Sequence, residues 1–114
     1  MAIKIIKEKI SKDDLRDIAD EFFGEMIKSV VDIEKEIIAV GGELHVDANE
    51  ALLSNGSKQE NIWGINIYLD KPKSEWIEFS SLINIRPLAN NRSMVIEASE
   101  IREKIIEIVN KLIN

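Results

Sequence analysis

Two stretches in the second half of the chain alternate apolar and polar residues, and a period of two is typical of β-strands. They span residues 62–69 and 76–86, and a turn at Lys71-Pro72 separates them. This pattern predicts a long antiparallel hairpin. The side chains expected to face the core are Ile65, Ile67, Ile77, Phe79, Ile83 and Ile85.

Three other segments are predicted to be helices, the first and last of them because apolar residues recur at helical spacing. Residues 12–23 follow Ser11, which can cap a helix, and precede Gly24, which can end one. Residues 48–54 follow Asp47, which with Glu50 forms a D-x-x-E start. A third helix is predicted after a Ser99 cap.

The remaining strands come from short apolar runs. Residues 2–6 predict one strand. Residues 26–40 could form a helical stripe with one defect, but their β-branched residues favour two strands that turn near Glu34-Lys35. Residues 43–46 alternate and could add another strand. The expected order is β-α-β-β-(β)-α-β-β-α, an α+β fold with a mostly antiparallel sheet and helices packed on one face.

Composition limits the function classes. The chain of 114 residues has the usual size of one domain, expected to span residues 1–114. Its net charge of −6 argues against nucleic-acid binding, because an acidic protein repels phosphate backbones. It has no cysteine, which fits the cytoplasm, and no apolar run long enough to cross a membrane. No cofactor is expected.

The polar face of the two long strands is unusual for a solvent-facing sheet. It contains amides, aromatics, an acid and an arginine but no lysine: Asn66, Tyr68, Trp76, Glu78, Asn84 and Arg86. Such groups suit a ligand site or an interface, and Tyr68 and Trp76 are expected to be partly exposed. Hydrogen bonding to the loop at residues 88–94 is the structural alternative.

Residues 79–95 carry Arg86 and Arg92 and no acid. Two guanidinium groups beside Asn91 offer the donors that hold phosphate or carboxylate. An anionic ligand is therefore predicted where the polar sheet face meets the 88–94 loop. Internal ion pairs to Glu43 or Glu78 are the alternative.

Glu43, His45 and Asp47 would face one side of a strand and could bind a metal or form a general base. No second histidine completes a metal site, and Asp47 also fits a helix start. We therefore assign no metal ligand and no catalytic residue from the sequence. His45 and Glu43 remain candidates for ligand binding.

Several short segments resemble a family of small uncharacterised prokaryotic proteins, a domain of unknown function. They are Gly41-Gly42-Glu43-Leu44-His45, Gly56-Ser57-Lys58-Gln59, Trp63-Gly64-Ile65-Asn66-Ile67-Tyr68, Ile83-Asn84-Ile85-Arg86-Pro87 and Asn91-Arg92-Ser93. The resemblance extends over nearly the whole chain. It implies no activity, cofactor or catalytic residue.

The leading hypothesis is a binding or interaction module that forms a homodimer. Ile106 and Ile113 widen the apolar stripe of the last helix, as a dimer contact would. The alternative is a small enzyme for an anionic substrate, with Arg86 and Arg92 holding the anion and His45 as acid or base.

Overall fold

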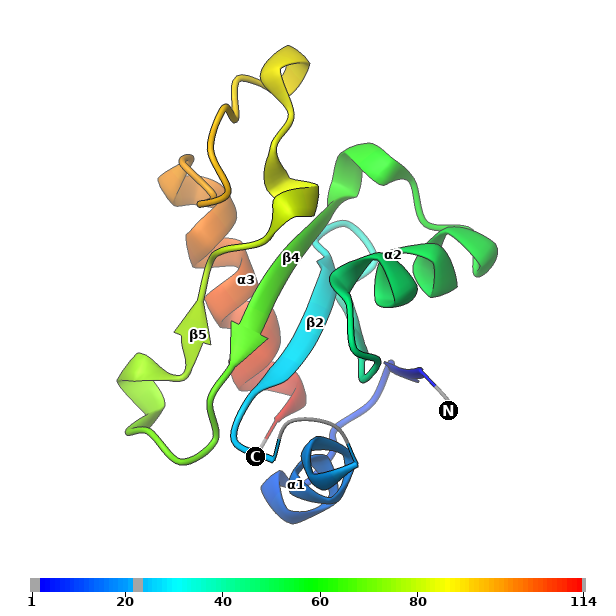
Figure 1. Cartoon of the computed structure of the whole chain (residues 1–114), viewed down its shortest axis with the longest axis vertical. Coiled ribbons are helices and arrows are strands. Elements are labelled where there is room, and N and C mark those ends of the chain that lie inside the picture. The colour runs from blue at the N-terminus through cyan, green and yellow to red at the C-terminus, as the bar shows by residue number, and fades with distance from the viewer. Residues whose placement is uncertain (1–2, 22–23, 114) are drawn as a thin grey trace.

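A five-stranded antiparallel sheet forms the centre of the protein (Figure 1). The computed structural model describes residues 3–21 and 24–113. The strands are β1 (Lys4–Ile6), β2 (Ile27–Asp32), β3 (Ile37–Val40), β4 (Ile62–Ile67) and β5 (Ile77–Glu78). Their order in the sheet is β1-β3-β2-β4-β5, so β1 and β5 are the edges. The expected α+β class with an antiparallel sheet is confirmed.

The three helices divide between the two faces of the sheet. They are α1 (Lys12–Asp20), α2 (His45–Ser54) and α3 (Ser99–Leu112). One core cluster joins α1 and α3 to the face that carries Val31 and Ile65, whereas Ala48 and Leu52 of α2 pack against Val30 and Ile62 on the other face. In Figure 1, α2 lies in front of the sheet and α3 behind it. Helices were expected on one face, and α2 departs from that expectation.

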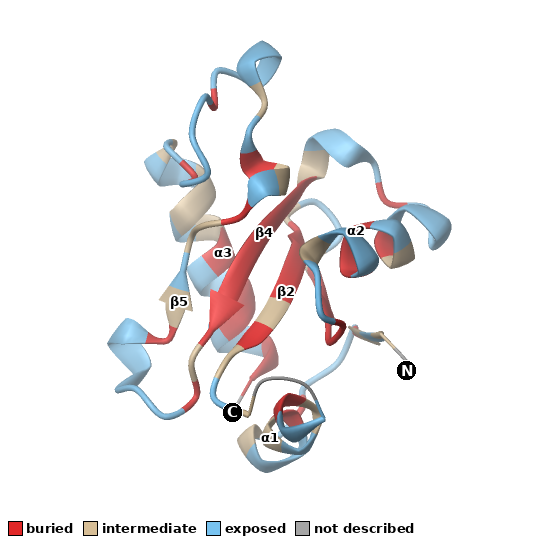
Figure 2. Cartoon of the chain, viewed as in Figure 1, coloured by how far each residue is buried: buried red, intermediate tan, exposed pale blue. Residues whose placement is uncertain are grey.

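Because both faces are covered, the central strands are buried along most of their length. Figure 2 shows β4 buried throughout and β2 buried over most of its length. Apolar residues therefore occupy both faces of β2, with Val31 in one core cluster and Val30 in the other.

The segment 26–40 forms two strands, as its β-branched residues predict. The turn between them lacks glycine and asparagine, and the buried Asp32 replaces them. Asp32 Oδ1 accepts hydrogen bonds from the backbone N–H groups of Glu34 and Lys35, both at 2.9 Å. Its Oδ2 accepts from the Ser57 hydroxyl at 2.6 Å. This carboxylate therefore holds the turn and ties it to the segment after α2.

The predicted strand at 76–86 is wrong beyond Glu78, since β5 ends there and the chain turns through short 3-10 helices at Leu82–Asn84 and Pro87–Ala89. The side chain of Asn84 takes the place of a strand neighbour: its Oδ1 accepts from Gly64 N at 2.8 Å and its Nδ2 donates to Gly64 O at 2.9 Å. As a result, Ile85 is 43% exposed rather than in the core. Ile65 and Ile67 are buried as predicted, and Ile77, Phe79 and Ile83 are partly buried.

Gly64 is explained by this close approach of the chain to β4. A Cβ at Gly64 would lie 2.6 Å from Ser81 Cβ and 3.0 Å from Ile83 Cγ1. Only a residue without a side chain lets the segment after β5 pack directly on the strand.

The predicted strand at 43–46 is also wrong, because α2 already begins at His45. Asp47 Oδ2 accepts from Leu44 N at 3.4 Å and so satisfies a backbone group at the start of the helix. Glu43, His45 and Asp47 therefore do not line one face of a strand.

The other helix ends agree in part with the sequence. Ser11 Oγ accepts from Asp14 N at 3.0 Å, so the predicted cap of α1 is confirmed. The helix itself ends at Asp20, and the last two residues of the predicted span lie outside the described residues. At α3 the cap position is Ala98, and Ser99 is the first helical residue.

Candidate functional site

A row of polar residues crosses three strands on the α2 face of the sheet. Asn66 of β4 lies opposite Lys28 of β2 on one side and opposite Glu78 of β5 on the other. Directly opposed residues of neighbouring strands point to the same face. The register thus places an ammonium, an amide and a carboxylate side by side.

His45, the first residue of α2, lies next to this row on the face of the sheet that α2 covers. Its Nε2 lies 2.8 Å from the carbonyl oxygen of Ile65. Because a carbonyl only accepts, Nε2 carries the hydrogen and Nδ1 is left as an acceptor. Burial lowers the pKa of His45 below 6.5, and the Lys28 charge adds to this. Hydrogen bonds to Ile65 O and to Asn66, which favour the charged ring, and the negative charge of Glu78 raise the pKa and oppose this effect. The imidazole is therefore neutral at neutral pH.

Asn66 is 8% exposed, and half of its amide is bonded. Its Nδ2 donates to Glu78 Oε1 at 2.7 Å and to the carbonyl of Ser80 at 3.3 Å. Both partners only accept, which fixes the amide with nitrogen toward them. Asn66 Oδ1 is buried, and no donor among the described residues bonds it. A buried acceptor without a partner is costly and uncommon.

Tyr68 extends the polar row beyond the end of β4. Its hydroxyl donates to Glu78 Oε1 at 3.3 Å, and Lys71 lies over its ring, 4.6 Å from the centroid. Burial, followed by the nearby Glu78 charge, raises the pKa of Tyr68 above 10.0. Glu78 therefore receives hydrogen bonds from two neighbours in the row.

A cavity of about 400 Å³ opens over this row, and we call it the α2–β5 pocket. Its polar lining consists of Lys28, His45, Asn66, Glu78, Ser80 and Ser81. Its apolar lining consists of Leu44, Val46, Leu82, Ile83 and Met94. Two of these apolar side chains are strongly exposed, Leu82 at 71% and Leu44 at 56%. An apolar rim above a few convergent polar groups is typical of a small-molecule site.

Arg86, the main predicted anion holder, does not line this pocket and donates its hydrogen bonds to backbone carbonyls. Its Nε donates to Ile83 O at 3.1 Å, one terminal nitrogen donates to Gln59 O at 2.9 Å, and the other donates to Ile62 O. The guanidinium also stacks on Trp63, 4.4 Å from the ring centroid. Burial lowers the pKa of Arg86. This geometry ties the segment after β5 to the start of β4.

Asn91 and Arg92, which were expected to hold an anion together with Arg86, form hydrogen bonds within the loop at residues 88–94 and to Glu97. Asn91 is buried; its Nδ2 donates to the carbonyls of Asn84, Ser93 and Val95, and its Oδ1 accepts from Glu97 N at 2.8 Å. Arg92 is exposed, and its backbone N–H donates to the Glu97 carboxylate at 2.8 Å. Glu97, an acidic residue just outside residues 79–95, therefore contacts the loop.

Seven of the eight predicted ligand residues therefore separate into two groups, and Glu43 belongs to neither. His45, Asn66 and Tyr68 gather at the polar row, whereas Asn84, Arg86, Asn91 and Arg92 belong to the loop. Arg86 bonds Ile62 at the start of β4, and Tyr68 follows its end. Six residues of strand span about 20 Å, too far for one small ligand to touch both. Glu43 is exposed, and it does not line the pocket.

A family model matches residues 4–112 of the chain. The chain belongs to that family, described as Protein of unknown function (DUF5674). No curated protein and no solved structure matches it. The membership supports the resemblance drawn from the sequence and brings no activity with it.

The sequence did not predict two parts of the α2–β5 pocket, Lys28 and the apolar rim. Lys28 is a charged residue inside the β-branched stretch of β2, and that interruption could have marked a polar row. Leu82 and Met94 carried no such signal, because their place at the rim depends on the path of the chain after β5.

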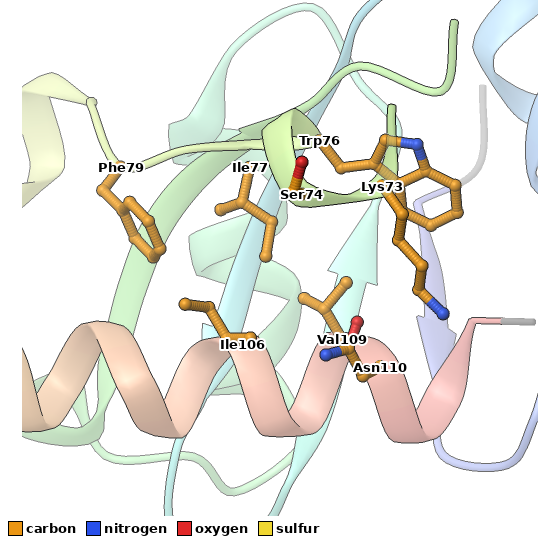
Figure 3. A pocket seen from close by; sticks show the side chains of 8 residues that line it. All are labelled: Lys73, Ser74, Trp76, Ile77, Phe79, Ile106, Val109 and Asn110. Carbon is orange, nitrogen blue, oxygen red and sulfur yellow. The ribbon is translucent and has the colours of Figure 1, made fainter. Parts of the chain in front are cut away.

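Another cavity, of about 410 Å³, lies between β5 and α3. Figure 3 shows Ile77 and Phe79 facing α3, with Ile106 and Val109 of the helix opposite them. Trp76 also lines this groove, but it is only 4% exposed, and its Nε1 donates to Lys71 O at 2.8 Å. The prediction that Trp76 is partly exposed is therefore wrong.

Two further findings concern the described ranges 3–21 and 24–113. They contain no cluster of three or more histidine or acidic side chains that could hold a metal ion. None of their helices is long and apolar enough to span a membrane.

Proposed function

We propose that this protein is a binding module that takes a small molecule in the α2–β5 pocket. The carrying observation is the cavity of about 400 Å³ with polar groups below and exposed apolar side chains at its rim. That volume lies in the range of roughly 300–1,000 Å³ usual for ligand pockets. A ligand that covers Leu44 and Leu82 would remove their exposed apolar surface from water, and that burial would favour binding.

Binding without chemistry accounts for the pocket better than the enzyme alternative does. That alternative needs Arg86 and Arg92 to hold an anion beside His45. Arg86 instead donates three hydrogen bonds to backbone carbonyls and does not line the pocket that contains His45. Ser80 and Ser81 line the pocket, but Ser81 Oγ accepts from Ile83 N at 3.3 Å, as a turn residue does.

Nuclear magnetic resonance can test the proposal with small aromatic probes. We would titrate ¹⁵N-labelled protein with benzamide, benzamidine and benzoate and follow the backbone amide shifts. At least one probe is expected to give saturable shifts at residues 44–46, 66 and 78–82. The proposal is contradicted if none of the three binds up to its solubility limit, or if the shifts lie only in the groove beside α3.

A rim substitution sharpens this test. Leu82 is exposed and contributes to the pocket wall, so Leu82→Ser should weaken probe binding with little loss of stability. Leu88→Ser is the matched control, because Leu88 is fully exposed and does not line this pocket. Equal affinity in both variants would argue against the pocket.

A further inference from the structure

We propose that the ligand of the α2–β5 pocket presents an N–H donor, as an amine, amidine or amide, attached to an apolar body. The inference rests on the proposed function and adds the chemical class of the ligand. It is carried by the balance of donors and acceptors that Asn66, His45 and Glu78 leave for a ligand.

The acceptors of the pocket are in surplus. Asn66 Oδ1 is buried without a donor from the part of the chain that the structure describes. His45 Nδ1 is an acceptor, because the ring hydrogen is on Nε2. The Glu78 carboxylate has about four lone-pair positions, and Asn66 and Tyr68 each donate to only its Oε1.

The side-chain donors of Asn66, His45 and Tyr68 are used. Asn66 Nδ2 donates to Glu78 and to Ser80 O, the His45 ring hydrogen goes to Ile65 O, and the Tyr68 hydroxyl goes to Glu78. An incoming carboxylate or phosphate would set its oxygens against these unpaired acceptors. An incoming N–H group would satisfy them.

The charges favour a cationic donor over a neutral one. Glu78 contributes a carboxylate to the lining, and His45 is neutral because burial lowers its pKa. Lys28, which has contacts of its own, is the cation in this lining and lies on the far side of Asn66 from Glu78. A ligand cation next to Glu78 is therefore separated from Lys28 by the width of a strand.

The apolar body follows from the rim. Leu44, Val46, Leu82 and Met94 are each at least 41% exposed and line the same cavity. A ring or branched alkyl group attached to the donor would lie against these side chains. Its burial supplies a hydrophobic contribution that a bare ammonium ion lacks.

Three probes with one common ring test the donor class. Benzamidine offers charged N–H donors, benzamide offers neutral ones, and benzoate offers only acceptors. We expect benzamidine to bind at least about tenfold more tightly than benzoate, with benzamide between them, as one satisfied polar group would give. Equal or tighter binding of benzoate in the pocket would overturn the inference and leave the proposed function standing. Binding of none would contradict both.

A charge-removing variant tests the role of Glu78. Glu78→Gln keeps an oxygen that accepts from Asn66 and Tyr68 but loses the negative charge. We expect the advantage of benzamidine over benzamide to fall to about parity while benzamide affinity stays within about twofold. Glu75→Gln is the matched control, because Glu75 is exposed and outside the pocket lining. An unchanged preference for benzamidine in Glu78→Gln would show that the carboxylate does not recognise the donor.

Discussion

Three buried asparagines illustrate how one residue type serves different ends. Asn84 and Asn91 use both ends of their amides to bond backbone groups. Asn66 bonds through its nitrogen and leaves its oxygen buried without a partner in the described ranges. All three were predicted to bind a ligand, and the sequence could not separate them, because the partner of a side-chain amide depends on where the chain passes.

Asn84 should be important for stability. Asn84→Ala would leave the N–H and C=O of Gly64 unpaired in a buried place, and each lost partner costs about 1–3 kcal/mol. We expect a loss of roughly 3 kcal/mol in the free energy of unfolding, measured by urea titration. Asn110→Ala, at an exposed position of α3, is the control and should change little. A loss in Asn84→Ala no larger than that in Asn110→Ala would mean that the hydrogen bonds between Asn84 and Gly64 do not stabilise the fold.

His45 should make stability depend on pH in a window of its own. Its pKa is lowered in the fold by burial, so below 6.5 the unfolded chain binds a proton that the folded chain resists. Stability should therefore be complete above 6.5 and fall as the pH drops toward the folded pKa, by at most about 1.4 kcal/mol per pH unit. Lys28 and Glu78 are the charged groups facing the ring.

Urea titrations of wild type and His45→Asn at several pH values check this. His45 is the one histidine of the chain, so the variant should lose the decline just below 6.5. The lowered carboxyl pKa values of Glu36 and Glu97 affect stability only below 4.5 and should remain in both proteins. Parallel curves between 6.5 and 4.5 would refute a buried neutral His45.

At the scale of elements, the sequence pattern predicted the segments that bury an apolar face or stripe in the core. Hydrophobic periodicity indicated β4, α1 and α3, and the density of β-branched residues indicated β2 and β3. Periodicity failed at 43–46 and 79–86, where single polar side chains redirect the backbone. Asp47 starts α2 early, and Asn84 replaces a strand at Gly64. Period two persisted through 79–86 although the backbone is not a strand there.

Arg86 should act as a clamp between elements rather than as an anion site. Arg86→Ala removes three hydrogen bonds to carbonyls and the contact with Trp63, so we expect a loss of about 2–4 kcal/mol in unfolding free energy. Arg86→Lys should recover only part of it, because one ammonium cannot reproduce the fork. Thermal unfolding of wild type in phosphate and in chloride of equal ionic strength supplies the second readout. A stabilisation specific to phosphate that Arg86→Ala lacks would restore the anion prediction.

At the scale of the whole molecule, the two predicted site groups lie toward opposite ends of β4. Residues that share a face in the sequence pattern were expected to form one site, but the strand separates Arg86 from Tyr68 by about 20 Å. The α2–β5 pocket also needs residues from α2 and from the segment after β5, which only the tertiary structure brings together. The polar face was therefore predictable, and the extent of the site was not.

Self-association remains a prediction, and of the two isoleucines that suggested it only Ile106 is exposed. Ile113 is buried, whereas Ile106 is 40% exposed beside the groove that contains Phe79. We expect light scattering to give twice the mass of one chain at high concentration and Ile106→Lys to give a single chain. Leu53→Lys, at an exposed apolar position on α2, is the control. A single-chain mass for wild type at every concentration would end the prediction.

The central claim is that the α2–β5 pocket holds a ligand through Asn66 and Glu78. A high-resolution crystal structure of the protein with benzamidine tests it most directly. The account predicts the ring against Leu44 and Leu82, with an amidine nitrogen about 2.7–3.2 Å from Asn66 Oδ1 and the Glu78 carboxylate within the same reach. A structure in which Asn66 Oδ1 is bonded by a neighbouring side chain, and benzamidine lies elsewhere or is absent, would contradict it.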